Sequence, residues 1–281
     1  MIKFIRSYID AKLVSWLIKL PVSQFYHHFK YLNLFWLKWP ISVGLSENGC
    51  CLKVMGFDKQ YVFVGRASRI KLYRSGVAAR LQLLESQYML DNIQFSGGDW
   101  IIDIGANVGE VTKYLQETYN VNSVAVEPEK IERNCLEMNT RKDNTIIFDE
   151  PLWSESIMLE WYEANNTADS SLLETEGAGG VVERQTITLD EVIRRAGLEN
   201  KTIKLLKLEA EGAEPEILQG AKQTLPHVMY VAADLGPERG IKNDNTVIPV
   251  MGILAGYGFV PIKFSFERGV MLFMSGEKKI S

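Results

Sequence analysis

The feature that most constrains the fold is the stretch from Asp99 to Gly109, which reads DWIIDIGANVG. Its first half is a short apolar run rich in isoleucine, and its second half is a turn bounded by Gly105 and Gly109, after which a helical pattern begins. A buried strand, a glycine turn and a helix in this order predict the opening of a nucleotide-binding βαβ unit. A second apolar strand follows about one helix later and ends at Glu127 and Pro128. An acid at the tip of the second strand is placed to accept hydrogen bonds from ribose hydroxyl groups.

The glycine spacing indicates which nucleotide is bound. Dinucleotide-binding proteins use GxGxxG, whose second glycine makes room for a pyrophosphate, but Asn107 stands at that place here. This favours a ligand without phosphates, such as S-adenosylmethionine (SAM), and disfavours an NAD-dependent oxidoreductase. We expect Asp103 and Asn107 to serve the amino-acid end of SAM and Glu127 its ribose, the alternative being a turn that binds nothing. The cofactor-binding residues predicted from these two motifs are Asp103, Gly105, Ala106, Asn107, Gly109, Glu127 and Pro128.

A third apolar strand is predicted from 145 to 148, and the segment from Asp149 to Leu152 follows it. The end of the third strand lies near the adenine in this architecture, so both residues join the predicted cofactor site. Asp149 is a candidate for the exocyclic amine, with a loop-capping acid as the alternative. Further strands are predicted at 158–162 and 181–189 and a helix at 189–196, around a polar loop at 165–180 that is functional or disordered.

Acids gather where two later strands end. A fourth parallel strand is predicted from 204 to 209, with Lys207 and Glu209 on one face, and it leads into a glycine turn with Glu211. A fifth strand starts at His227, interpreted as structural, and ends at Asp234. Ligands bind at the carboxyl ends of strands in open α/β sheets. We therefore interpret Glu209, Glu211 and Asp234 as candidate bases or metal ligands and Lys207 as stabilising charge; a plain Lys207–Glu209 ion pair is the alternative.

The first forty residues differ from the rest of the chain. They carry six basic residues and one acid, a net charge of about +5, which leaves about −9 for the remainder. Apolar residues recur at helical spacing up to Pro21, and an aromatic group follows from Phe25 to Trp39. Basic residues with interfacial aromatics are typical of a helix lying in a membrane surface, although no apolar run is long enough to span a bilayer. A helix packed on the body or on a second subunit is the alternative.

Residues 41–95 are interpreted as a lead-in module, with a hairpin around 52–64 and a helix from 76 to 93 that forms one wall of the site. Arg66, Arg69 and Arg74 are interpreted as solvated surface, with contact to an anionic substrate as the alternative. Residues 96–281, closed by an antiparallel pair at 258–264 and 269–274, form the predicted catalytic domain. The chain of 281 residues has a net charge of −4, so nucleic acid is not expected as a partner. Its three cysteines show no pairing pattern, which favours a reduced, intracellular protein.

Taken together, the motifs resemble the FkbM family of SAM-dependent methyltransferases over roughly residues 66–274. The motifs that carry the resemblance are DIGANVG at 103–109, EP at 127–128, SSL at 170–172, TLD at 188–190 and LKLEAEGAE at 206–214. The stretch DLGPERG at 234–240 resembles one branch of the family. The resemblance implies an α/β, Rossmann-like class I methyltransferase fold, with a seven-stranded, mostly parallel sheet and a C-terminal antiparallel hairpin. The N-terminal helical and small β segments are an extension of this fold.

The resemblance also implies O-methylation, often of sugars or polyketide hydroxyls. We therefore expect a sugar or glycan acceptor, lipid-linked or a surface polysaccharide precursor, for a protein in the cytoplasm with peripheral contact to the inner face of the membrane. A divalent metal is compatible with the carboxylates but not indicated by them, and a homo-oligomer is compatible with the N-terminal helix. The alternative from another class is a catalytically inactive nucleotide-binding or scaffold module of a glycan biosynthesis complex.

Overall fold

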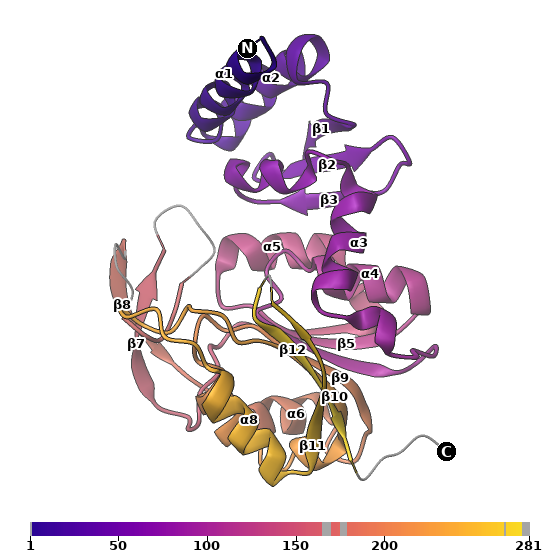
Figure 1. Cartoon of the computed structure of the whole chain (residues 1–281), viewed down its shortest axis with the longest axis vertical. Helices are drawn as coiled ribbons and strands as arrows, with labels where there is room; N and C mark the ends of the chain where they lie inside the picture. The colour runs from indigo at the N-terminus through magenta and orange to yellow at the C-terminus, as the bar shows by residue number, and fades with distance from the viewer. Residues whose placement is uncertain (1, 165–169, 175–178, 267, 277–281) are drawn as a thin grey trace.

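A computed structural model describes residues 2–164, 170–174, 179–266 and 268–276 of the chain (Figure 1). Its centre is a seven-stranded sheet in the order β11-β12-β10-β9-β4-β5-β6, in which β12 runs in the opposite direction to the other six strands. The strands are β4 (Trp100–Ile104), β5 (Asn122–Val126), β6 (Thr145–Phe148), β9 (Ile203–Leu208), β10 (Val228–Asp234), β11 (Phe259–Ser265) and β12 (Val270–Ser275). This order confirms the predicted class I methyltransferase fold with its late antiparallel hairpin.

Helices cover both faces of the sheet, which explains why its strands are almost continuously apolar. Helices α6 (Leu189–Ala196), α7 (Glu214–Gln219) and α8 (Val247–Gly256) pack on the face that carries Ile102 and Ile104. Helices α3 (Val77–Gln87) and α4 (Glu110–Tyr119) pack on the face that carries Ile101, and α5 (Lys130–Asn139) lies beside α4. Helix α8 was not predicted from the sequence. Short 3₁₀ turns are η2 (Ala67–Tyr73), η3 (Leu90–Asn92), η4 (Lys142–Asn144) and η5 (Leu225–His227).

Two buried charges interrupt this apolar sheet at the same level. Asp103 on β4 lies opposite Lys207 on the neighbouring β9 in the strand register, and both side chains are almost completely buried. Because side chains alternate along a strand, both project to the face covered by α3 and α4. The charges lie near the carboxyl ends of their strands, where the pocket opens.

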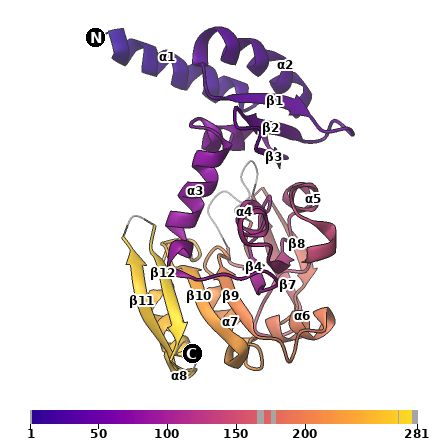
Figure 2. The ribbon, with the colours of Figure 1, turned by 90° about the vertical axis from the view of Figure 1, so that its right-hand side faces the viewer.

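The N-terminal extension is a helical pair on a small sheet (Figure 2). Helix α1 (Ile2–Leu17) and helix α2 (Val22–Leu32) lead through a π-turn, η1 (Asn33–Leu37), into strands β1 (Ile41–Leu45), β2 (Leu52–Gly56) and β3 (Tyr61–Val64). The helix before Pro21 and the hairpin are confirmed, whereas α2 and β1 were not predicted. Phe25 and Phe29 of α2 share one apolar cluster with Leu52 and Val54 of β2. The boundaries predicted at 40 and 95 stay predictions.

Asn139 is one of the side chains that join this extension to the catalytic body. The amide of Asn139, at the end of α5, donates to the carbonyls of Phe63 at 2.9 Å and of Val108 at 2.7 Å. Its oxygen accepts from the amide nitrogen of Phe63 at 2.7 Å, so it satisfies both backbone groups of a residue on the edge strand β3. The lead-in sheet is therefore held directly above the loop that follows β4.

Strands β7 (Met158–Glu163) and β8 (Gly180–Gln185) were both predicted, and they form a separate two-stranded antiparallel sheet outside the central one. Trp161 of β7 turns a buried side chain toward the site. Of the polar loop predicted at 165–180, residues 165–169 and 175–178 lie outside the described residues. Ser170 and Ser171 are described and buried.

Candidate active site

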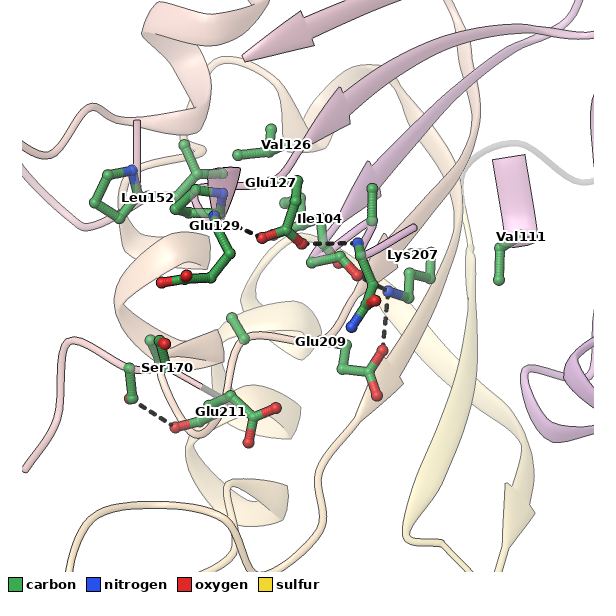
Figure 3. Close-up of a pocket in the computed structure, with 18 of the residues that line it drawn as sticks. Ile104, Val111, Val126, Glu127, Glu129, Leu152, Ser170, Lys207, Glu209 and Glu211 are labelled. Atoms are coloured by element: carbon green, nitrogen blue, oxygen red, sulfur yellow. Dashed lines mark hydrogen bonds and ion pairs between the residues drawn. The ribbon is translucent and has the colours of Figure 1, made fainter. Parts of the chain in front are cut away.

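A pocket of about 290 Å³ opens at the carboxyl ends of β4, β5 and β9 (Figure 3). Of the residues predicted from the sequence, the following line it: Gly105, Ala106, Asn107, Glu127, Pro128, Leu152, Lys207, Glu209 and Glu211. Four others, Asp103, Gly109, Asp149 and Asp234, are not among the lining residues. The helix predicted at 76–93 does form a wall, because Arg80, Leu84 and Tyr88 line the pocket.

The turn between β4 and α4 has a left-handed backbone at two positions where glycine avoids both strain and a collision. Gly105 has φ +66°, and a Cβ there would collide with the backbone carbonyl of Glu209. Gly109 has φ +81°, and its added Cβ would lie 2.6 Å from Leu136 of α5. Gly105 therefore allows β4 and the loop after β9 to approach, while Gly109 allows α4 to pack on α5. Asn107, between them, is itself left-handed with φ +53°.

Glu127 ties the end of β5 to this turn. Its two carboxylate oxygens accept from the amide nitrogen of Asn107 at 2.7 Å and from that of Glu129 at 2.8 Å. The side chain is only 6% exposed, and burial raises its pKa to about 7 although both backbone donors oppose the shift. A carboxylate has about four acceptor positions, so Glu127 retains acceptor capacity for a ligand in the pocket.

Lys207 organises the floor of the site. Its ammonium lies 3.3 Å from Oδ1 of Asp103 and 3.0 Å from Oε2 of Glu209, and it donates to the carbonyls of Ile104 and Gly105 at 3.0 and 2.7 Å. Burial acts to lower the pKa of Lys207, but the two carboxylates outweigh it and the pKa is raised. Asp103 is therefore enclosed behind Lys207, where its other oxygen accepts from Thr112 at 2.8 Å. The ion pair between Lys207 and Glu209, the alternative role considered for these residues, is present, and Lys207 also holds the glycine turn through its carbonyls.

Glu209 is surrounded by donors. Besides Lys207, it accepts from the hydroxyl of Tyr88 at 2.6 Å and from Arg268 at 3.2 Å. Burial acts to raise its pKa, but Lys207, Tyr88 and Arg268 together lower it to about 2. Glu209 is thus a permanently charged group and a weak base. It follows β9, whose last residue is Leu208, and does not lie inside the strand as the sequence suggested.

Asp234 does not line the pocket but contacts Arg268, which does. It lies at the end of β10 and accepts from Arg268 at 3.0 Å, while Arg268 also contacts Glu209. Burial and the nearby charge of Glu209 raise the pKa of Asp234, although Arg268 opposes the shift. Arg268 therefore bridges two carboxylates that come from different strands.

Glu211 lies in the glycine-containing loop that follows β9, with a left-handed φ of +49°, and its carboxylate lies apart from that of Glu209 (Figure 3). Its backbone carbonyl accepts from the hydroxyl of Ser171 at 3.2 Å. Glu214 anchors the same loop, because it accepts from the amide nitrogens of Ala210 at 2.9 Å and Gly212 at 3.2 Å. The loop is thus held from two sides with the Glu211 carboxylate at the pocket.

The end of the pocket toward β6 is apolar. Leu152 and Trp161 are buried there, and the indole of Trp161 donates to Glu129 at 3.0 Å. Asp149 points elsewhere, since its side chain is 61% exposed and pairs with Arg133 at 3.3 Å. Its predicted contact with adenine has no support in this geometry.

Sequence reasoning did not select Tyr88, Arg268 and Arg80, and it gave a ligand contact for Arg69 only as the alternative to a solvated surface; all four residues line the pocket. Tyr88 lies within the helix predicted at 76–93, and Arg268 lies between the strands predicted at 258–264 and 269–274. Of the three arginines interpreted as surface, only Arg74 is exposed. The local signal in the sequence was Arg80, a charged residue at a position where the helical periodicity places side chains toward the protein interior.

Two further properties concern only the described part of the chain. Within it, no group of three or more His, Cys, Asp and Glu side chains is arranged to hold a metal ion. In the same ranges no helix is both long and apolar enough to cross a membrane.

The sheet order, the short glycine turn and the acid after β5 define a class I methyltransferase. Residues 103–260 match the family model described as the methyltransferase FkbM domain, so the chain belongs to the FkbM family of SAM-dependent methyltransferases. A relative from Sinorhizobium fredii, 2-O-methyltransferase NoeI, is 19% identical over 78% of this chain and 96% of its own. A second, the 31-O-demethyl-FK506 methyltransferase FkbM of Streptomyces tacrolimicus, is 22% identical over 62% and 78%. The solved structure of M. capricolum TrmK with S-adenosylhomocysteine is 10% identical over 69% of this chain and 68% of that chain, with a TM-score of 0.38.

Proposed function

We propose that this protein transfers the methyl group of SAM to a hydroxyl group of a sugar or glycan. The names of the two relatives each describe methylation at an oxygen, and the motif resemblance implies sugar or polyketide hydroxyls as acceptors. The observation that carries the proposal is the link from Glu127 to the backbone of Asn107, which places an acceptor-rich acid beside the glycine turn.

The residues present fit SAM. Glu127 has the acceptor capacity for two ribose hydroxyls, and the apolar end formed by Leu152 and Trp161 suits an adenine ring. No second glycine is needed at Asn107, because SAM has no pyrophosphate. When bound, SAM supplies a methyl group on a sulfonium cation.

The protein must align the acceptor and remove its proton. Alignment alone contributes up to roughly 7–11 kcal/mol in favourable cases. Glu209, with its pKa of about 2, is unsuited as a base and instead provides a fixed negative charge. We assign proton removal to Glu211, which lines the pocket; Asp234 is the second candidate, although it meets the pocket only through Arg268.

The test is a transfer assay with methyl-labelled SAM and a panel of free, nucleotide-linked and lipid-linked sugars. We expect label in a sugar product that survives mild alkali, because a methyl ether is stable under conditions that cleave a methyl ester. Label lost in alkali would contradict O-methylation of a hydroxyl. Binding of S-adenosylhomocysteine without transfer to any sugar would favour the inactive-module alternative.

We also propose that the N-terminal extension contacts an anionic lipid surface on the cytoplasmic side of a membrane, which would give access to a lipid-linked acceptor. The supporting features are unusually exposed apolar side chains on α1 to η1, where Trp16, Leu34 and Phe35 are 52%, 66% and 72% exposed. Lys19 and Lys30 are exposed on the same elements. Exposed aromatic rings with basic residues are typical of interfacial binding.

Vesicle flotation tests this contact with substitutions, because deleting 1–40 would uncover Phe25 and Phe29 in the shared core. We expect Leu34→Ser/Phe35→Ser to lose flotation with vesicles containing anionic lipid. A matched change of the exposed Phe57, on the β2–β3 turn, should keep it. Equal flotation of all three proteins, or loss of a dimer in the double variant, would assign this face to another partner.

A further inference from the structure

The pocket has a second charged cluster, contributed mainly by the lead-in module. Glu110, the first residue of α4, accepts two hydrogen bonds from Arg80, at 2.9 and 3.2 Å. It also accepts from Arg69 of η2 at 3.1 Å and from the hydroxyl of Tyr73 at 2.9 Å. Arg69, Arg80 and Glu110 all line the pocket.

Positive charge is in excess in this cluster. Two guanidinium groups face one carboxylate, and their side chains are only 15% and 10% exposed. Burial acts to raise the pKa of Glu110, but Arg80 and Arg69 outweigh it, so Glu110 is ionised and neutralises only one of them. Nε of Arg69 is buried and has no hydrogen-bond partner among the described residues. An unpaired buried donor on a charged group costs free energy.

Two further acids lie beside the cluster and contact a different arginine. Glu132 accepts from Arg66 at 2.7 Å, and Glu129 lies 3.8 Å from the same arginine and accepts from Trp161. Within the described residues, neither has a hydrogen bond to Arg69 or Arg80, so Glu110 is the acid that these two guanidinium groups share.

Building on the proposed function, we propose that Arg69, supported by Arg80, binds an anionic group, a carboxylate or phosphate, of a ligand in the pocket. A guanidinium offers a planar pair of donors that matches both anions. Two ligands can bring such a group: SAM through its amino-acid carboxylate, or the acceptor through an acidic sugar or a phosphate.

The experiment measures three affinities by calorimetry: for S-adenosylhomocysteine, for methylthioadenosine, which lacks the amino-acid tail, and for inorganic phosphate in the presence of S-adenosylhomocysteine. The variants are Arg69→Met, which keeps the apolar stem, and Arg69→Lys, which keeps the charge. Arg74→Met is the matched control, because it removes one arginine from the exposed end of the same segment. Melting temperatures verify that each variant is folded.

If the anion is the SAM carboxylate, Arg69→Met weakens S-adenosylhomocysteine about ten- to hundredfold and leaves methylthioadenosine unchanged. If it belongs to the acceptor, both nucleosides bind as in the wild type while phosphate binding is lost. Arg69→Lys should recover part of either loss, and Arg74→Met should show none. Unchanged binding of all three ligands to Arg69→Met would overturn the proposal. Failure of the wild type to bind S-adenosylhomocysteine would instead reject the proposed function, and a phosphate titration alone would still test the anion site.

Discussion

The replacement Lys207→Met tests whether one buried ammonium holds the floor of the pocket together. In the folded protein this group faces Asp103 and Glu209 and donates to two carbonyls of the glycine turn. Methionine removes the charge but fills most of the space. Asp103, only 1% exposed, would then keep its hydrogen bond from Thr112 but carry an uncompensated buried charge.

Removing one partner of a buried ion pair costs about 3–5 kcal/mol, and we expect a loss of this size in the free energy of unfolding. Urea unfolding followed by tryptophan fluorescence measures it. The control Lys204→Met changes the same strand, but its ammonium lies 6.0 Å above the ring of Tyr230, so we expect a loss below about 1 kcal/mol.

The double variant Asp103→Asn/Lys207→Met separates the charge effect from packing. Neutralising Asp103 removes the unpaired charge, so the double variant should be more stable than Lys207→Met alone. A loss below about 1 kcal/mol for Lys207→Met, or strictly additive losses in the double variant, would refute the reasoning.

Three further outcomes follow from the geometry. Burial raises the pKa of Glu127 from 4.5 to about 7. Its contribution to the free energy of unfolding is therefore complete below pH 4.5 and is lost as the pH rises through 7. The free energy of unfolding of the wild type should fall over this range, and that of Glu127→Gln should not. Glu211→Gln and Asp234→Asn should both retain binding of S-adenosylhomocysteine while at least one loses turnover, and full activity in both would remove these carboxylates from the mechanism. Asn139→Ala removes two hydrogen bonds between α5 and the lead-in sheet and a third to the carbonyl of Val108 in the loop after β4, so we expect a loss of about 2–4 kcal/mol and faster amide exchange at Phe63; protection equal to the wild type would contradict this.

The parts of the site that could be predicted are local in sequence. The turn after β4 and Glu127 after β5 belong to one βαβ unit, whose strand, glycine and acid signals lie within about thirty residues. Asp103 and Lys207 could be identified but not placed, since the register that makes them neighbours joins strands far apart in the chain. Their enclosure behind the turn follows from that register.

The residues and elements that could not be predicted depend on contacts between segments that are distant in the sequence. Tyr88 and Arg268 contact Glu209 from 121 and 59 positions away, and no local pattern specifies such contacts. Helix α8 contains Pro249 and two glycines, which weaken its helical signal, and packing on the sheet through Val250 and Leu254 stabilises it instead. The periodicity of β7 and β8 predicted strands, but whether a strand joins the central sheet is decided by pairing partners.

The most direct test of the account is a calorimetric titration with S-adenosylhomocysteine and, separately, NAD, on the wild type and on Glu127→Ala. We expect the wild type to bind S-adenosylhomocysteine and not NAD, and the variant to bind it about a hundredfold more weakly while remaining folded, because two hydrogen bonds between the ribose and Glu127 are lost. Binding of NAD, or equal affinity of both proteins for S-adenosylhomocysteine, would contradict the assignment of this pocket and of Glu127 to the ribose.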